Sequence, residues 1–78
     1  MNLLRKRKLV RVAQFRLGMI IELRKAFFKG FYKGSVVDIR NKPQYVHYRV
    51  SDSSLKNEIG KLYRLDENVF KVWDIYEA

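Results

Sequence analysis

Residues 15–24 carry a large apolar side chain at every second position, and this period of two restricts the possible folds more than any other feature. The apolar positions are Phe15, Leu17, Met19, Ile21 and Leu23. Successive side chains of a β-strand point to opposite faces of its sheet, so this period predicts a strand with one buried face. We therefore expect a strand that begins at Phe15 and runs to Leu23.

A single helix from Leu3 to Phe28 is the competing interpretation of this region. Apolar residues such as Leu17 and Ile20 also recur there at intervals of three to four, as on a helical face. Gly18, Gly30 and Gly34 weaken this helical pattern, because each interior glycine costs a helix about 1 kcal/mol relative to alanine. The sequence favours the strand.

Two further strands are expected around a turn. Residues 27–34 mix aromatic side chains with lysines and glycines, which indicates a loop leading into a strand over residues 36–39. Residues 41–43 (Asn-Lys-Pro) form a turn signal, because proline fixes φ and lacks a backbone donor. Residues 44–50 show the cleanest alternation in the chain. It places Val46, Tyr48 and Val50 on one face and Tyr45, His47 and Arg49 on the other.

The last part of the sequence predicts a helical turn and a hairpin. Ser54 is expected to cap one turn of helix near residues 55–59, and Gly60 suits the left-handed end of that turn. Residues 62–65 and 69–76 are expected to pair with each other as a closing hairpin. Trp73 is expected to belong to the core.

Together these elements predict a mostly β fold: a small barrel of about four or five antiparallel strands, because closure leaves few unpaired strand edges. A chain of 78 residues is one domain near the lower size limit for an unaided core. We divide it into a basic N-terminal extension over residues 1–14 and a barrel domain over residues 15–78. Residues 1–14 fit neither period, so a helix and a strand beginning near Leu9 both remain open.

Positive charge is concentrated in the first half of the chain. Seventeen Lys and Arg stand against eight Asp and Glu, for a net charge of +9. Residues 1–42 hold twelve basic and two acidic residues, a net of +10, whereas residues 43–78 hold five basic and six acidic residues, a net of −1. Such a one-sided excess sets up a field that attracts polyanions.

The candidate binding residues combine these cations with aromatic rings. Cations displace counterions from phosphates, and rings offer a surface on which bases stack. The candidates in the N-terminal arm are Arg5, Lys6, Arg7, Lys8 and Arg11; those in the barrel are Lys25, Lys29, Tyr32, Lys33, Arg40, Lys42 and Tyr45. For Phe27, Phe28 and Phe31, a place in the core is the favoured interpretation over base stacking.

Several functional classes are disfavoured by the residues present. The chain has no cysteine, its one histidine (His47) has no carboxylate pair beside it in the sequence, and its acidic residues are dispersed. We therefore expect no metal site, no cofactor, no small-molecule substrate and no enzymatic activity. Its longest apolar runs are too short to cross a bilayer, and no signal-peptide pattern follows the basic start. A cytoplasmic location, or a nucleoid or nuclear one, is expected; secretion and membrane association are not.

Three segments resemble strands of SH3-like small barrels of the Tudor and Agenet kind. They are residues 15–23, 30–39 and 45–52, within a resemblance that covers about residues 15–72. The resemblance implies a binding module, since some members hold methylated lysine or arginine in an aromatic cage and related barrels bind DNA or RNA. The cage candidates are Phe31, Tyr32, Tyr45 and Tyr48. Lys29 and Lys33 flank Phe31 and Tyr32 and would repel a cation, which disfavours a methyl-lysine reader.

The sequence thus predicts a nucleic-acid-binding module with weak sequence preference. The alternative is a protein-interaction module that docks on an acidic partner protein, as an inhibitor or assembly factor of a nucleic-acid machine. Its contact surface would be the near-neutral C-terminal half around Trp73 and Tyr76.

Overall fold

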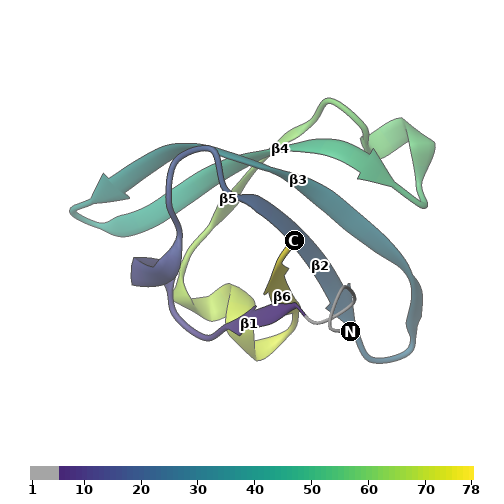
Figure 1. The fold of residues 1–78 in the computed structure, drawn as a ribbon, viewed down its shortest axis with the longest axis horizontal. Helices are drawn as coiled ribbons and strands as arrows, with labels where there is room; N and C mark the ends of the chain where they lie inside the picture. The colour runs from purple at the N-terminus through teal and green to yellow at the C-terminus, as the bar shows by residue number, and fades with distance from the viewer. Residues whose placement is uncertain (1–5) are drawn as a thin grey trace.

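A computed structural model describes residues 6–78 as one bent antiparallel sheet (Figure 1). The strands are β1 (Arg7–Leu9), β2 (Ile20–Lys25), β3 (Phe28–Asn41), β4 (Gln44–Ser53), β5 (Leu62–Leu65) and β6 (Asp74–Glu77), in the spatial order β1-β6-β2-β3-β4-β5. Three short 3₁₀ turns complete the described part: η1 (Val12–Gln14), η2 (Lys56–Glu58) and η3 (Glu67–Lys71). The mostly β, antiparallel fold class is confirmed, with six strands where four or five were expected.

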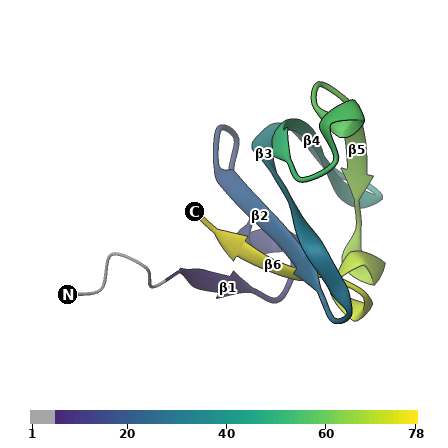
Figure 2. The same ribbon diagram turned by 90° about the vertical axis from the view of Figure 1, so that its right-hand side faces the viewer.

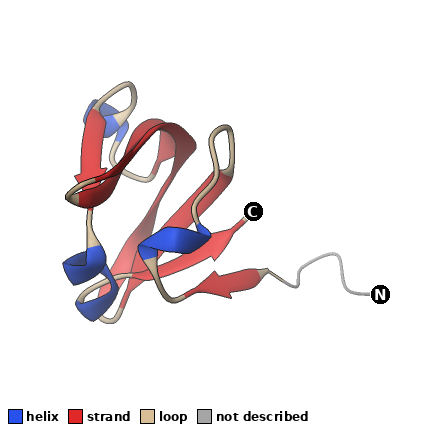
Figure 3. Cartoon of the chain, turned by 90° about the vertical axis from the view of Figure 1, so that its left-hand side faces the viewer, coloured by secondary structure: helices blue, strands red, loops and turns tan. Residues whose placement is uncertain are grey.

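The two long strands bend the sheet into a barrel-like shell. β3 pairs with β2 along its first half and with β4 along most of its length, and its pairing with β4 is interrupted by two register shifts. The shell therefore curls so that β1, β6 and β2 lie across from β4 and β5 (Figure 2). η3 spans the remaining side between β5 and β6, and η1 lies beside it (Figure 3). The enclosed core consists of Leu9, Val12, Phe15, Met19, Ile21, Leu23, Val36, Val46, Tyr48, Val50, Leu65 and Ile75.

Residues 7–14, which the sequence analysis set apart as an extension, contribute to this shell. β1 pairs with β6 through Leu9 and Ile75, and the side chains of Leu9 and Val12 are buried. A strand is thus observed near Leu9, but it ends at this residue instead of beginning there. The competing helix from Leu3 to Phe28 is absent from its described portion, residues 6–28. No helix within residues 6–78 has the length and apolar character needed to span a membrane.

The first predicted strand is only partly correct. β2 begins at Ile20, and Phe15 and Met19 are buried from a loop instead of a strand. Gly18, with φ of +82°, turns this loop back, and its N–H donates to the carbonyl of Val36 at 2.8 Å. The turn points Leu17 away from the core, and its side chain is 67% exposed. Before Ile20, the chain therefore turns back on itself at Gly18 and does not continue as an alternating strand.

The loop expected over residues 27–34 is instead the start of β3. A two-residue turn, Ala26 and Phe27, joins β2 to β3 and pairs Lys25 with Phe28. This early start also lets β3 reach the end of β4, where Tyr32 pairs with Ser53. The core position expected for Phe27 is wrong, because the turn leaves its side chain fully exposed.

The predicted closing hairpin is also wrong. β5 pairs with β4, whereas β6 pairs with β1 and β2 on the far side of the sheet. Residues 67–71, expected to belong partly to the second strand of that hairpin, form η3 and carry the chain across. Which strands pair in a barrel depends on how the whole sheet closes. The alternation of side chains along one strand sets which face is buried, but it does not specify the partner strand.

The helical turn near residues 55–59 is confirmed as η2, and Gly60 has the expected positive φ, at +93°. The predicted cap is wrong, since Leu55 precedes η2 and no side chain caps it. Ser54 instead accepts a 2.9 Å hydrogen bond from the N–H of Phe31, which fastens η2 to β3.

Candidate functional site

A basic and aromatic surface lies on the outer side of β3, β4 and β5, and we call it the basic face. It consists of Arg40, Tyr45, His47, Arg49 and Arg64. Directly paired residues of antiparallel strands point to the same side of the sheet. Arg40 is paired with Tyr45, and His47 with Arg64, while Val46 and Tyr48 between them face the core. The alternation of β4 thus positions the whole surface.

The side chains of the basic face contact one another. The guanidinium carbon of Arg64 lies 4.3 Å from the centroid of the Tyr45 ring, a cation–π contact. The Tyr45 and His47 rings meet edge to face at 5.3 Å. Arg49 donates a 3.1 Å hydrogen bond to the carbonyl of Gly60. These contacts hold the Arg64 guanidinium against the Tyr45 ring and fix Arg49 to the backbone of Gly60.

One carboxylate, Asp38, borders this surface. Arg40 Nε donates to it at 2.9 Å, and His47 Nδ1 lies 3.6 Å from the same oxygen. The hydrogen bond from Arg40 holds the pKa of Asp38 below its usual value, with a smaller contribution from His47. Within residues 6–78, no carboxylate forms an ion pair with Arg49, Arg64 or the neighbouring Lys42. The basic face therefore keeps a net positive charge.

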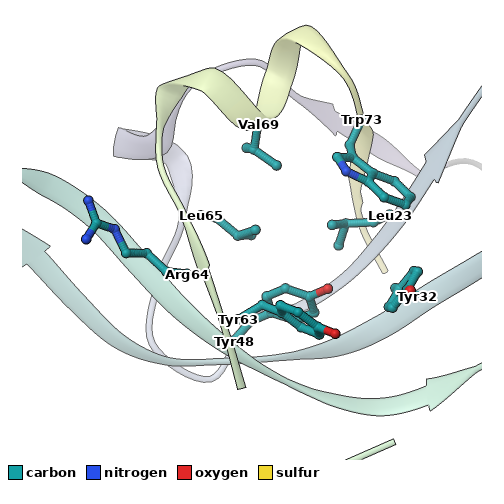
Figure 4. Close-up of a pocket in the computed structure, with 8 residues that line it drawn as sticks. All are labelled: Leu23, Tyr32, Tyr48, Tyr63, Arg64, Leu65, Val69 and Trp73. Carbon is teal, nitrogen blue, oxygen red and sulfur yellow. The ribbon is translucent and has the colours of Figure 1, made fainter. Parts of the chain in front are cut away.

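A second feature, the aromatic pocket, opens between β5, η3 and the strands β2 to β4 (Figure 4). Its volume is about 240 Å³, and it is lined by Leu23, Tyr32, Tyr48, Tyr63, Arg64, Leu65, Val69 and Trp73. Leu23, Tyr48 and Leu65 are buried, so they form its floor. Tyr32, Tyr63 and Trp73 are only partly buried and form its walls.

Glu58 on η2 holds two of these walls in place. The hydroxyls of Tyr32 and Tyr63 both donate to its Oε1, and Lys61 Nζ lies 2.8 Å from its Oε2. The hydrogen bond from Lys61, followed by that from Tyr63, holds the pKa of Glu58 below its usual value. Partial burial and the Glu58 charge raise the pKa of Tyr32, and the hydrogen bond to Glu58 raises that of Tyr63.

The N-terminal candidates are mostly engaged in ion pairs. Lys6 pairs with Glu22. Arg7 pairs with Glu77 of β6 at 3.5 Å, and Lys8 pairs with Asp74 of β6 at 3.2 Å. Arg11 is exposed just before η1. Arg5 lies outside the described residues. The acidic residues of the last strand thus offset much of the charge of the first.

The candidates of the barrel fall into separate groups along β3. Lys25 and Lys29 lie at the β2–β3 hairpin, and the Lys25 ammonium is 4.6 Å from the centroid of the Trp73 ring. Lys33 is paired across the sheet with Asp52. Arg40, Lys42 and Tyr45 lie at the β3–β4 hairpin, at the other end of β3 (Figure 1). Of these candidates, only Arg40 and Tyr45 belong to the basic face, and Lys42 lies in the turn next to it.

The structure divides the cage candidates as well. Tyr32 and Tyr48 line the aromatic pocket, Tyr45 lies on the basic face, and Phe31 carries the Arg24 guanidinium 5.6 Å from its ring centroid. Two aromatic residues of the pocket were not among the cage candidates: Tyr63, which stacks obliquely on Tyr48, and Trp73, which meets Tyr32 edge to face. Tyr63 and Tyr48 are cross-strand partners, whereas Trp73 reaches Tyr32 only because η3 carries the chain back across the shell.

Arg49 and Arg64 were also missed as binding candidates, because they belong to the near-neutral half of the sequence. A usable signal existed for Arg49, since the alternation of residues 44–50 already places it on the face of Tyr45. For Arg64 no local signal existed, because its place depends on the pairing of β5 with β4.

Comparisons with protein-family models, curated proteins and solved structures find no match to this chain. Within the part of the chain that the structure describes, no three His, Cys, Asp or Glu side chains are grouped so as to hold a metal ion. Inferences about function therefore depend on the two surfaces described above.

Proposed function

We propose that this chain is a nucleic-acid-binding module with weak sequence preference, and that it binds through the basic face. The observation that carries the proposal is the contact of the Arg64 guanidinium with the Tyr45 ring, on the same face as Arg49, which has no carboxylate partner among residues 6–78. Guanidinium groups donate in a planar fork that matches phosphate geometry, and they also stack on flat rings. A surface of this kind, built on β-strands, can contact a phosphate backbone and stack bases at the same time.

Weak sequence preference follows from the chemistry of these side chains. Arginines that contact phosphates carry no sequence information, and every base offers a ring face for stacking. The resemblance to Tudor and Agenet barrels supports a binding role, and it stays a prediction. A cytoplasmic location, or a nucleoid or nuclear one, where nucleic acid is available, is part of the same proposal.

Charge reversal on the basic face tests the proposal against a matched control. The double variant Arg49→Glu with Arg64→Glu and the control Arg11→Glu with Lys71→Glu change the net charge equally. Arg11 and Lys71 are exposed beside η1 and on η3, away from β3 to β5. Titration with a labelled mixed-sequence oligonucleotide should show at least about tenfold weaker binding for the first pair than for the control. Equal losses in both would contradict binding through this face.

The salt dependence of affinity gives the number of phosphates neutralised. If Arg40, Lys42, Arg49 and Arg64 each contact one phosphate, log K should fall with log salt with a slope of about −3 for a single strand and about −4 for a duplex. The Arg49→Glu, Arg64→Glu variant should have a slope shallower by about 1.5. An affinity independent of salt would argue against a polyanion.

One observation favours an acidic protein as the second candidate partner. β5 is an edge strand, and within residues 6–78 no strand pairs with its free side. Such an edge can accept a strand from a partner protein, and Arg64 on β5 would favour an acidic one. Capture of a protein that survives nuclease treatment, with no oligonucleotide binding, would support this candidate over nucleic acid.

A further inference from the structure

The aromatic pocket has the chemistry of a binding site that the basic face does not use. Its walls meet nearly at right angles: Tyr32 and Trp73 at 84° with centroids 5.5 Å apart, and Tyr32 and Tyr63 at 89° with centroids 6.3 Å apart. A flat guest that stacks on one of these rings therefore stands nearly perpendicular to the neighbouring ring and contacts it edge to face. Offset-stacked and edge-to-face contacts are both favourable for aromatic rings.

The walls are held in place by contacts within the fold. Glu58 accepts hydrogen bonds from the hydroxyls of both Tyr32 and Tyr63, and Phe28 packs edge-on against Trp73 at 5.8 Å. A preformed site spends little of its binding energy on ordering side chains. The arrangement therefore suits a rigid, flat guest.

The charges near the pocket favour an anionic guest. The Lys25 ammonium lies over the Trp73 ring, and Arg64 forms part of the lining. The carboxylate of Glu58 is shared by two hydroxyls and the ammonium of Lys61. A cationic guest would be repelled by Lys25, whereas a phosphate attached to a bound ring would be attracted by Lys25 and by the Arg64 guanidinium, which points away from the pocket toward Tyr45 (Figure 4).

Size narrows the class of guest further. The volume of about 240 Å³ is below the range of about 300–1,000 Å³ typical of drug-sized ligands. The pocket thus has room for one flat ring system, and the groups attached to that ring must lie outside.

We propose that the aromatic pocket binds one unstacked nucleobase of a single-stranded nucleic acid. Arg64 joins this site to the basic face, because it lines the pocket and also stacks on Tyr45. The inference rests on the proposed function and adds a preference for single strands. In a duplex the bases are paired and stacked, so none is free to enter a pocket without being extruded.

Trp73 provides the test, because it is the only tryptophan in the chain and forms a pocket wall. Its fluorescence is followed in the full chain during titration with a single-stranded oligonucleotide, its duplex, and an abasic oligomer with the same number of phosphates, all at one salt concentration. The base-bearing single strand should quench Trp73 and bind about 5- to 150-fold more tightly than the abasic oligomer. The duplex and the abasic oligomer should leave the emission nearly unchanged.

Variants separate the pocket from the basic face. Tyr32→Leu should reduce the affinity for the base-bearing strand to that of the abasic oligomer, whereas Tyr76→Leu, on β6 outside the pocket, should not. Lys25→Met changes a hairpin side chain outside the buried core and should weaken binding of the base-bearing strand. Urea unfolding of each variant verifies that it folds.

The outcomes distinguish the two proposals. Equal affinity for base-bearing and abasic strands, with no effect of Tyr32→Leu, would overturn the pocket and leave the basic face standing. No binding of any oligonucleotide would overturn both. Quenching by an acidic peptide and not by the oligonucleotide would assign the pocket to a protein partner and overturn this inference.

Discussion

Phe27 occupies the tip of the β2–β3 hairpin with φ of +65° and a fully exposed side chain. For a residue with a bulky side chain the left-handed region costs about 1–2 kcal/mol. A buried ring would offset this cost, but an exposed one does not. Strain of this kind is often kept at positions used for binding, and Lys25 and Lys29 lie on the same hairpin.

Phe27→Asn should raise the free energy of unfolding by up to about 1 kcal/mol, because asparagine tolerates the left-handed region. The measurement is urea denaturation at constant pH. Phe28→Asn, at the next position, is the control: it should destabilise the fold, since Phe28 packs on Trp73 and Tyr32. Lower stability for Phe27→Asn would show that the exposed ring contributes to the fold.

Glu22 is a buried carboxylate held by two cations. Its side chain is 7% exposed and accepts hydrogen bonds from Lys6 and Arg24. Burial raises the pKa of Glu22, but the hydrogen bonds from Lys6 and Arg24 outweigh it, and the net pKa lies below the usual value. The folded state therefore favours the ionised form more than the unfolded chain does.

This depressed pKa predicts acid sensitivity. The stabilising contribution of ionised Glu22 is fully present above the pKa of an unfolded glutamate, about 4.3. It is lost as the pH falls through the lower pKa of the folded state. The wild-type free energy of unfolding should thus decrease below about pH 4, and Glu22→Gln should be less stable at neutral pH and lose less on acidification. Urea denaturation across that range measures both. Identical pH profiles would show that other carboxylates dominate.

At the scale of elements, β3 depends on one close approach to β4. A Cβ built on Gly34 would lie 2.1 Å from the carbonyl oxygen of Arg49, which is a severe clash. Gly34 lies next to a register shift in the β3–β4 ladder, where the sheet bends. Glycines at such sites commonly mark a bulge or a close backbone contact.

Gly34→Ala should destabilise the protein by about 1–3 kcal/mol, the usual cost of inserting atoms into a filled space. The control is Ser35→Ala, which removes a hydroxyl from the next position of the same strand. Urea denaturation compares the two with the wild type. A Gly34→Ala variant as stable as Ser35→Ala would mean that β3 shifts away from β4 without cost.

At the scale of the whole molecule, folding rearranges the charge that the sequence separates. The basic first strand pairs with the acidic last strand, through Arg7 with Glu77 and Lys8 with Asp74. Two cations of the near-neutral half, Arg49 and Arg64, then lie without a carboxylate partner among residues 6–78 on the basic face. The proposed binding surface therefore draws on both halves of the chain.

The aromatic pocket is likewise a product of the whole shell. Its walls come from β3, β5 and the segment between η3 and β6, which curvature of the sheet brings together (Figure 4). Tyr48 and Tyr63 are cross-strand partners, whereas Trp73 approaches only because η3 carries the chain back across the shell.

Local periodicity was enough to predict the mostly β class, the buried face of β4 and the turn at η2, because each depends on neighbours within a few residues. It was not enough for the partners of β5 and β6, the exposed position of Phe27, or the grouping of Arg64 with Tyr45. Those features depend on which strands lie together when the sheet closes around one core. Side-chain alternation selects a face, but only the tertiary structure selects the strand across from it.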